Sequence, residues 1–219
     1  MTALYPDFLR LPIAHRALHD LTDGRPENSL SAIRAAIQAG YGIEIDLQPS
    51  ADGVPMVFHD YTLDRLTGAK GPISQRTAAE LGQIPLAGSS HGDTIPTLAE
   101  VLDLVAGQVP LLIEIKDRDG ALGPDVGTLS REAAEVLAAY TGPVAVMSFT
   151  PHAIAAFTPH APGVRVGLTT GRFLPENWPV PQARLDELRA IPDFTPLGAS
   201  FVSHHADALD APRVAELKA

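Results

Sequence analysis

The stretch GIEIDLQPSADGVPMVFHD, residues 42–60, places two carboxylic acids inside an apolar run and ends near a histidine. Side chains alternate across a strand, so Glu44 and Asp46 would share one face while the intervening apolar residues take the other. The segment PSADG is typical of a turn and is too short for a helical crossover. We therefore expect a hairpin whose returning arm places His59 opposite Glu44. This stretch alone predicts two carboxylates and an imidazole in one place.

A second segment, LLIEIKD, repeats the alternation and places Glu114 and Lys116 on one face. The first expected strand ends in His15 and Arg16. Carboxylates gathered this closely would repel one another without a positive charge among them, and oxygen ligands suit a hard divalent cation such as Mg²⁺ or Ca²⁺. An arginine and a lysine beside such a cation suit a phosphoryl group, and two histidines can serve as general acid and base. The residues therefore predict metal-assisted cleavage of a phosphate ester.

Each of these residues has a simpler interpretation when it is taken alone. A solvent-facing edge strand explains Glu44 and Asp46 with a prior of roughly one half. Asn28 or Ser29 can cap the helix expected at 26–40, and this is the favoured interpretation of Asn28, although it also lies at the mouth of the expected barrel. His204 and His205 end the last expected strand, where a solvated strand end is the favoured interpretation. The functional hypothesis rests on the combination, because four separate segments contribute at equivalent strand ends.

The elements that must position these residues alternate between apolar strands and helices. Strands are expected at 9–16, 41–47, 110–117, 143–150, 163–169 and 198–204, and helices at 26–40, 97–107, 126–140, 151–159, 181–190 and 211–219. Thr97 followed by Glu100 predicts a capping box. Strands separated by helices indicate a parallel sheet built of βαβ crossovers. The expected fold class is therefore α/β, a (β/α)8 TIM barrel with its site at the carboxyl ends of the strands.

Composition limits the class of protein. The 219 residues, 45% of them hydrophobic, suit one globular domain, residues 1–219. A net charge of −10 gives no general electrostatic reason to bind nucleic acid or an anionic membrane. The absence of cysteine excludes disulfides, zinc–thiolate sites and cysteine nucleophiles. We find no signal peptide and no transmembrane window, so the expected location is cytoplasmic, without an integral membrane segment.

Together these residues resemble the glycerophosphodiester phosphodiesterase family of the phospholipase C-like phosphodiesterase superfamily. The matching stretches, in the family's order, are AHR at 14–16, PENS at 26–29, the 42–60 stretch above, TLDRLTG at 62–68, IPTLAEVL at 95–102, IEIK at 113–116 and SF at 148–149. The resemblance implies hydrolysis of glycerophosphodiesters to an alcohol and glycerol 3-phosphate with a divalent metal, Mg²⁺ or Ca²⁺. It also implies a small insertion after the second strand, which would explain residues 48–95.

The resemblance also implies a role for each candidate. By position these are a catalytic acid and base, His15 and His59; three metal ligands, Glu44, Asp46 and Glu114; and phosphate or substrate contacts, Arg16, Lys116 and Asn28. The two cations would stabilise charge that develops in the transition state. In related phospholipases a neighbouring substrate hydroxyl attacks phosphorus first, and the glycerol 2-hydroxyl could do the same here.

The chain departs from the family at its end. Family members continue with a strand that carries a Trp-Thr motif and with a last strand that ends in Thr-Asp, whereas this sequence stops at AELKA. The single tryptophan, Trp178, precedes the sixth expected strand and is not that residue. We expect two missing strands, which would leave open sheet edges. A shortened chain is favoured over two chains that complete each other and over a compromised fold.

Two further functions stay open beside the favoured one, which would serve lipid and glycerol metabolism on a small-molecule substrate. One is a phospholipase D-like or phosphatidylinositol-cleaving lipid phosphodiesterase, which an exposed apolar rim would support. The other is a non-catalytic metal- and phosphate-binding module, which would bind glycerol 3-phosphate in the presence of metal but hydrolyse nothing. The missing strands would line the pocket, so the sequence does not predict which head group is released.

Overall fold

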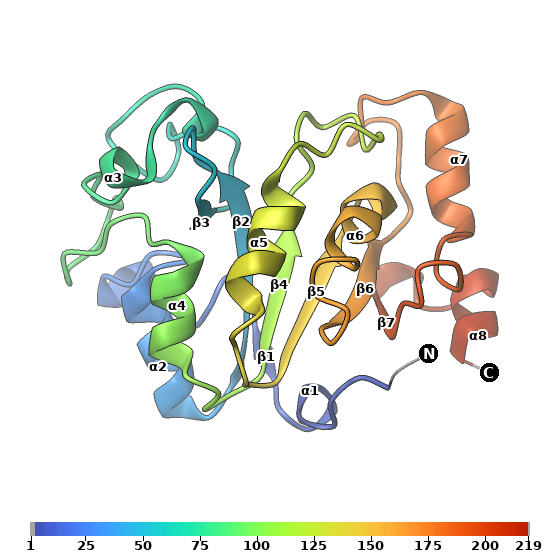
Figure 1. The fold of residues 1–219 in the computed structure, drawn as a ribbon, viewed down its shortest axis with the longest axis horizontal. Helices are drawn as coiled ribbons and strands as arrows, with labels where there is room; N and C mark the ends of the chain where they lie inside the picture. Colours follow the sequence, from blue (N-terminus) through green and yellow to red (C-terminus); the bar gives the residue numbers. More distant parts are fainter. Residues whose placement is uncertain (1–2, 219) are drawn as a thin grey trace.

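The computed structural model describes residues 3–218. Figure 1 shows one sheet, with the carboxyl ends of β2 and β4 at the top and most helices along one face. The strands are β1 (Ile13–Ala14), β2 (Gly42–Pro49), β3 (Pro55–Val57), β4 (Leu111–Ile115), β5 (Val144–Ser148), β6 (Arg165–Thr170) and β7 (Phe201–His204). The helices are α1 (Asp7–Arg10), α2 (Leu30–Ala39), α3 (Ala78–Leu81), α4 (Leu98–Val105), α5 (Leu129–Leu137), α6 (Pro151–Phe157), α7 (Gln182–Ala190) and α8 (Pro212–Lys218).

The sheet confirms the expected alternation of strands and helices. Its strands pair in the order β1-β2-β4-β5-β6-β7, all parallel, and β3 adds to β2 in the antiparallel direction. Within residues 3–218 the path ends at β1 and β7, which do not pair with each other, so the sheet is a half-barrel. None of the helices described between residues 3 and 218 combines the length and the apolar character that a membrane-spanning helix needs.

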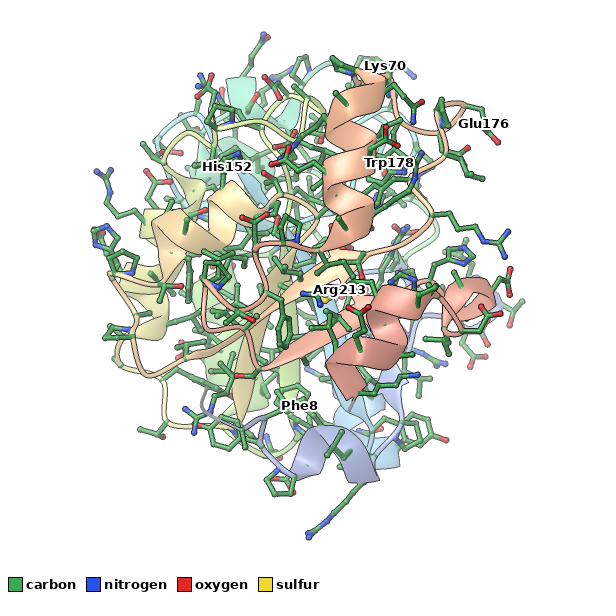
Figure 2. The ribbon with its side chains drawn as sticks, turned by 90° about the vertical axis from the view of Figure 1, so that its right-hand side faces the viewer. Phe8, Lys70, His152, Glu176, Trp178 and Arg213 are labelled. Atoms are coloured by element: carbon green, nitrogen blue, oxygen red, sulfur yellow. The ribbon has the colours of Figure 1, made fainter. Side chains whose placement is uncertain are left out.

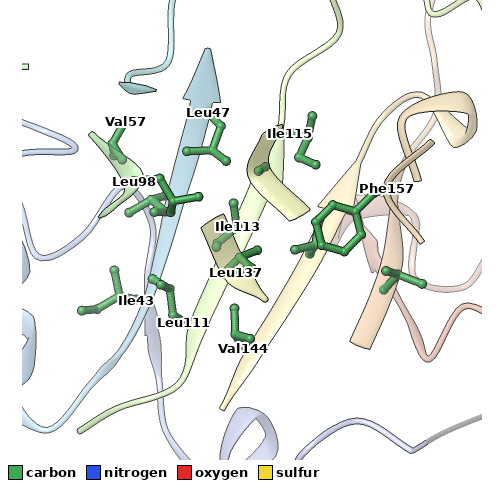
Figure 3. Packing of buried hydrophobic residues seen from close by; sticks show 14 of the residues in the cluster. Ile43, Leu47, Val57, Leu98, Leu111, Ile113, Ile115, Leu137, Val144 and Phe157 are labelled. Carbon is green, nitrogen blue, oxygen red and sulfur yellow. The ribbon is translucent and has the colours of Figure 1, made fainter. Parts of the chain in front are cut away.

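The larger core lies between the sheet and its helices, on what we call the outer face. Alternate residues of β2, namely Ile43, Ile45 and Leu47, are fully buried there. Figure 3 shows Ile43 and Leu47 together with Ile113 and other side chains of this cluster. Since alternate side chains of a strand point to opposite faces, this packing turns Glu44 and Asp46 to the other side, the inner face. The expected division of β2 into an apolar and an acidic face is therefore confirmed.

Helix α4 begins as the sequence predicts. The Oε2 atom of Glu100 accepts hydrogen bonds from the Thr97 backbone N–H and hydroxyl, both at 2.8 Å, and the Thr97 Oγ1 accepts from the Glu100 N–H at 3.2 Å. This reciprocal pair satisfies donors that the first turn of a helix leaves free. It fixes where α4 begins after residues 48–95, a segment that leaves the alternation of strands and helices and that we call the excursion.

The expected strand at 9–16 is largely wrong. Only Ile13–Ala14 form strand β1, and Asp7–Arg10 form the short helix α1. Pro6 starts this helix, and Leu11 leaves it in an extended conformation, as the residue before a proline does. Phe8 packs against the lower part of the inner face, in one cluster with Leu112 of β4 and with Ala145 and Met147 of β5. Figure 2 shows Phe8 at the bottom of the molecule, where α1 covers the strands.

The expected hairpin forms, but its register is shifted by one residue. Leu47 pairs with Val57 and Pro49 with Pro55, so His59 does not lie opposite Glu44. The physical reason is the turn: the Ser50 N–H donates to the Val54 carbonyl at 3.1 Å, and the Val54 N–H donates to the Ser50 hydroxyl at 2.8 Å. The loop closes between Ser50 and Val54. The expected register needs a turn centred between residues 51 and 52, which would close between residues 50 and 53. Strand β3 stops at Val57, and His59 lies in the bend that follows it.

The excursion, residues 48–95, has a small core of its own. Its buried apolar residues all lie between residues 56 and 95 and do not belong to the main cluster. They are Met56, Phe58, Leu63, Ile73, Leu81, Leu86 and Ile95. Asp93 ties this unit to the start of α2, because its carboxylate accepts from the Ser31 N–H at 3.0 Å and from the Ser31 hydroxyl at 2.7 Å. The excursion is therefore a packed unit held at the top of the sheet (Figure 1).

We predict that Phe8→Ala destabilises the fold by about 3 kcal/mol, because a buried phenyl ring is removed from the inner face. Leu9→Ala is the matched control, since Leu9 lies on the same helix but is 79% exposed, and it should change stability by less than about 0.5 kcal/mol. Urea unfolding followed by circular dichroism measures both. Equal effects of the two substitutions would show that α1 is not docked on the sheet.

Candidate active site

Three carboxylates meet on the upper inner face, where β2 and β4 end. Asp46 and Glu114 are neighbours in the register of the two parallel strands, and Glu44 precedes Asp46 on the same face. One oxygen from each carboxylate lies within 4.8 Å of the others. Their exposed fractions are only 4%, 1% and 6% for Glu44, Asp46 and Glu114. Their separation and burial match a site for a single cation.

Two cationic residues contact this cluster. The Nζ atom of Lys116 lies 2.7 Å from Oδ1 of Asp46 and 2.6 Å from Oε1 of Glu114, so it bridges β2 and β4. The backbone N–H of Arg16 donates to Oε2 of Glu44 at 2.9 Å, and its side-chain Nε lies 3.7 Å from Oδ2 of Asp46. The expected grouping of these five residues is therefore what the structure shows.

Burial and the neighbouring charges shift the pKa values of three residues in the cluster. Burial, together with the negative charge of Asp46, raises the pKa of Glu44 to about 8. Burial also raises the pKa of Glu114. Burial alone would lower the pKa of Lys116, but the charges of Glu114 and Asp46 outweigh it and raise that pKa. Lys116 contacts Asp46 and Glu114, whereas Glu44 accepts from the backbone N–H of Arg16, so a further positive charge beside Glu44 would stabilise its ionised form.

Asn28 serves the site rather than the helix. Ser29 is the N-cap of α2, since its Oγ accepts from the Ala32 N–H at 3.1 Å. The Asn28 side-chain amide donates to Oδ2 of Asp46 at 2.9 Å, and its oxygen accepts from the Asp46 N–H at 3.3 Å. Its backbone lies in the left-handed region, with φ of 57°. Such a conformation is unfavourable outside glycine, although asparagine tolerates it best, and it is found at functional sites.

The two candidate histidines lie at the edge of the cluster. His15, which follows β1, is exposed, whereas His59, which follows β3, is partly buried. Partial desolvation and the charge of Arg16 lower the pKa of His15. Burial and the charge of Lys116 lower the pKa of His59. Both imidazoles are therefore neutral at neutral pH, the state in which one can accept a proton.

Three charged residues around the site were missed by the sequence interpretation. The His59 Nδ1 lies 2.7 Å from Oδ1 of Asp60, Arg65 binds Asp60 and Glu27, and Glu27 in turn binds Arg16. Glu27 belongs to the matched stretch PENS, Asp60 ends the 42–60 stretch, and Arg65 belongs to TLDRLTG. Nothing in their spacing along the sequence connects them. Their link is visible only once the excursion is folded over β2.

Two pockets open at the carboxyl ends of the strands. One, of about 570 Å³, lies between the excursion and the loop after β4, and its walls include Lys116, Gln48 and Tyr61. The other, of about 340 Å³, lies above β5, β6 and β7 and includes Trp178 and His204. His204 is held by a 2.7 Å hydrogen bond between its Nδ1 and the hydroxyl of Thr170. The first pocket borders the carboxylate cluster through Lys116, so it offers room for a bound substrate.

Comparisons with known proteins agree with this geometry. A sequence model described as the glycerophosphoryl diester phosphodiesterase family matches residues 15–191. A glycerophosphodiester phosphodiesterase of Caldanaerobacter subterraneus is 31% identical over 178 residues, which are 77% of this chain and 70% of that protein. Human glycerophosphodiester phosphodiesterase 1 is 36% identical over 98 residues, which are 41% of this chain and 28% of that protein.

Solved structures show the same fold. A phosphodiesterase of Oleispira antarctica, solved in complex with the product sn-glycerol-3-phosphate, superposes with a TM-score of 0.74 at 26% identity, covering 97% of this chain and 82% of that one. A glycerophosphodiester phosphodiesterase of Thermotoga maritima, 24% identical, gives a TM-score of 0.64 over 94% of this chain and 78% of that one. With the family model covering most of the sequence, the resemblance noted above is confirmed: the chain is an enzyme of the glycerophosphoryl diester phosphodiesterase family.

Proposed function

We propose that this chain hydrolyses glycerophosphodiesters to an alcohol and glycerol 3-phosphate with the help of a divalent cation. The observation that carries the proposal is the cluster of three buried carboxylates with Lys116 and Arg16 against it. Oxygen ligands and two cations in one place suit a metal ion together with a phosphoryl group. The product named for the Oleispira structure is the product that this reaction would give.

A divalent cation fits the residues that are present. The donor set is all oxygen and buried, and burial together with the charge of Asp46 raises the pKa of Glu44 to about 8, so a bound cation would favour its ionised form. We propose Glu44, Asp46 and Glu114 as the ligands, with Asn28 holding the Asp46 carboxylate in place. A bound Mg²⁺ or Ca²⁺ would supply Lewis-acid polarisation of the phosphoryl group.

The residues around the cluster take the remaining roles. Arg16 and Lys116 would bind the phosphoryl oxygens and stabilise the charge that develops on them. His59 is the better general base, because an ionised Asp60 beside its Nδ1 leaves Nε2 free to accept a proton from the attacking hydroxyl. His15 in its protonated form would donate a proton to the leaving alcohol, and exchange with solvent would then reprotonate His15 and remove the proton that His59 took up. Attack by water or by the glycerol 2-hydroxyl is compatible with these roles.

The proposal includes two features of the fold that the sequence predicted, an insertion and two further strands. We treat residues 48–95 as an insertion into a single TIM-barrel domain, supported by their separate apolar cluster. Two further strands between β7 and β1 would close the half-barrel. They would border the pocket above β5–β7, so they would affect which alcohol is released.

The proposal predicts release of glycerol 3-phosphate from glycerophosphocholine and glycerophosphoethanolamine when Mg²⁺ or Ca²⁺ is present, and none with a chelator. An enzyme-coupled assay for glycerol 3-phosphate measures it. Cleavage of phosphatidylinositol vesicles alone would favour the lipid phosphodiesterase alternative. Metal-dependent binding of glycerol 3-phosphate without any hydrolysis would favour the binding module, and either result would contradict the proposal.

We predict that His59→Ala lowers kcat at least about 100-fold while leaving the thermal unfolding temperature nearly unchanged, because a partly buried proton acceptor is lost without a large cavity. His160→Ala is the matched control, since His160 is exposed after α6 and far along the chain from the site. Full turnover by the His59 variant would remove His59 from the mechanism.

The raised pKa of Glu44 predicts that metal binding is pH-dependent. A cation must displace the proton that Glu44 carries below a pKa of about 8, so affinity should rise from pH 6.5 to pH 8.5, by at most about tenfold per pH unit. Calorimetric titration with Mg²⁺ or Ca²⁺ in buffers of different ionisation enthalpy reports both the affinity and the proton released. Glu44→Gln should reduce the proton release, and a pH-independent affinity in the unmodified protein would contradict this assignment.

A further inference from the structure

One arginine of the excursion connects two segments of the candidate active site. The guanidinium of Arg65 donates to both oxygens of Asp60, from Nε at 2.7 Å and from Nη2 at 2.8 Å. It also donates to both oxygens of Glu27, from Nη1 and Nη2 at 2.9 Å each. Asp60 then contacts Nδ1 of His59 at 2.7 Å, and Glu27 accepts from Nη1 of Arg16 at 2.9 Å. A continuous chain of contacts therefore runs from the candidate base to a candidate phosphate contact.

We propose that Arg65 is a positioning residue, which orients the His59 imidazole through Asp60 and the Arg16 guanidinium through Glu27. The proposal rests on the function inferred above, and it adds a role for the excursion, from which Arg65 comes. Glu27 precedes α2 and Asp60 follows β3, and the side chain of Arg65, which comes from the folded excursion, joins these two segments.

Arg65 keeps Asp60 in the form that this role needs. The hydrogen bonds of Arg65 lower the pKa of Asp60 to about 2, against a smaller opposing effect of burial. An ionised carboxylate only accepts hydrogen bonds, so the proton of a neutral His59 must lie on Nδ1. The lone pair then lies on Nε2, and the ring is held in one tautomer and one orientation.

The second carboxylate behaves in the same way. Burial alone would raise the pKa of Glu27, but its hydrogen bonds to Arg65 and Arg16 outweigh burial and lower the pKa to about 2. Glu27 is therefore ionised, and it shares one oxygen, Oε1, between Nη2 of Arg65 and Nη1 of Arg16. Without Arg65, Glu27 would be free to turn and Arg16 would lose its fixed direction toward Asp46.

The contacts point to a role in catalysis more than in folding. The Arg65 side chain is 48% exposed and lies outside the apolar clusters, so its replacement leaves no cavity in the core. Its two paired, fork-like contacts need the planar guanidinium, which a lysine cannot reproduce. We therefore expect variants of Arg65 to fold but to lose the order of the site.

The first test compares Arg65→Gln and Arg65→Lys with Arg76→Gln, an exposed arginine of the same excursion. Both Arg65 variants should lower kcat about 10- to 100-fold while KM changes less than about threefold, in the range typical of residues that orient a functional side chain. Arg76→Gln should match the unmodified enzyme. Unchanged kcat in Arg65→Gln, or full rescue by Arg65→Lys, would overturn the proposal.

A second readout does not depend on activity, so it separates this proposal from the proposed function. Nitrogen-15 NMR of histidine-labelled protein, with the His59 signal assigned from a His59→Gln sample, reports which ring nitrogen carries the proton. The unmodified protein should show His59 protonated on Nδ1, and Arg65→Gln should show exchange between tautomers. An identical His59 signal in both proteins would overturn the proposal even if both proteins are inactive. A tautomer change in a folded protein without turnover would support it while contradicting the proposed function.

Discussion

The structure depends on keeping three carboxylates buried together at the ends of two neighbouring strands. The register of β2 and β4 places Asp46 directly beside Glu114, so the two charges are adjacent as long as the sheet is intact. Removing such charges from water is costly unless each is paired and hydrogen-bonded. Lys116, the Arg16 backbone N–H and the Asn28 amide each satisfy part of this need. Burial and the charge of Asp46 nevertheless raise the pKa of Glu44 to about 8, so these partners do not fully offset the cost of ionising it.

Much of the remaining architecture separates this polar cluster from the apolar interior. On the inner face, the apolar Leu112 lies low on β4, the charged Glu114 lies near its top, and Lys116 follows its end. Helix α1 covers the apolar lower part through Phe8, while the excursion folds over the charged upper part and brings in Arg65. The loops that approach the cluster have unusual backbones, with φ of 55° at Arg16 and 57° at Asn28. Hydrogen bonds to Glu44 and Asp46 hold these strained residues in place.

Features set by local periodicity could be predicted from the sequence, and features set by tertiary contacts could not. Alternation in β2 and β4 was enough to place the carboxylates, because side-chain direction in a strand has a fixed period. The hairpin register was wrong because it depends on the Ser50–Val54 closure, which is a property of loop conformation. The capping residue of α2 was left open between two neighbours, and the fold selected Ser29.

Contacts between distant segments explain the other differences. Helix α1 is too short to show a periodic pattern, and its burial depends on strands more than 100 positions later. Arg65 lies 38 positions from Glu27, so neither residue indicates the other until the excursion is folded.

Manganese is an oxygen-preferring ion that can replace Mg²⁺, so the most direct measurement is an anomalous diffraction map from crystals soaked in Mn²⁺. We predict one strong peak bound by oxygens of Glu44, Asp46 and Glu114, and a map without a peak among these carboxylates would contradict the assignment.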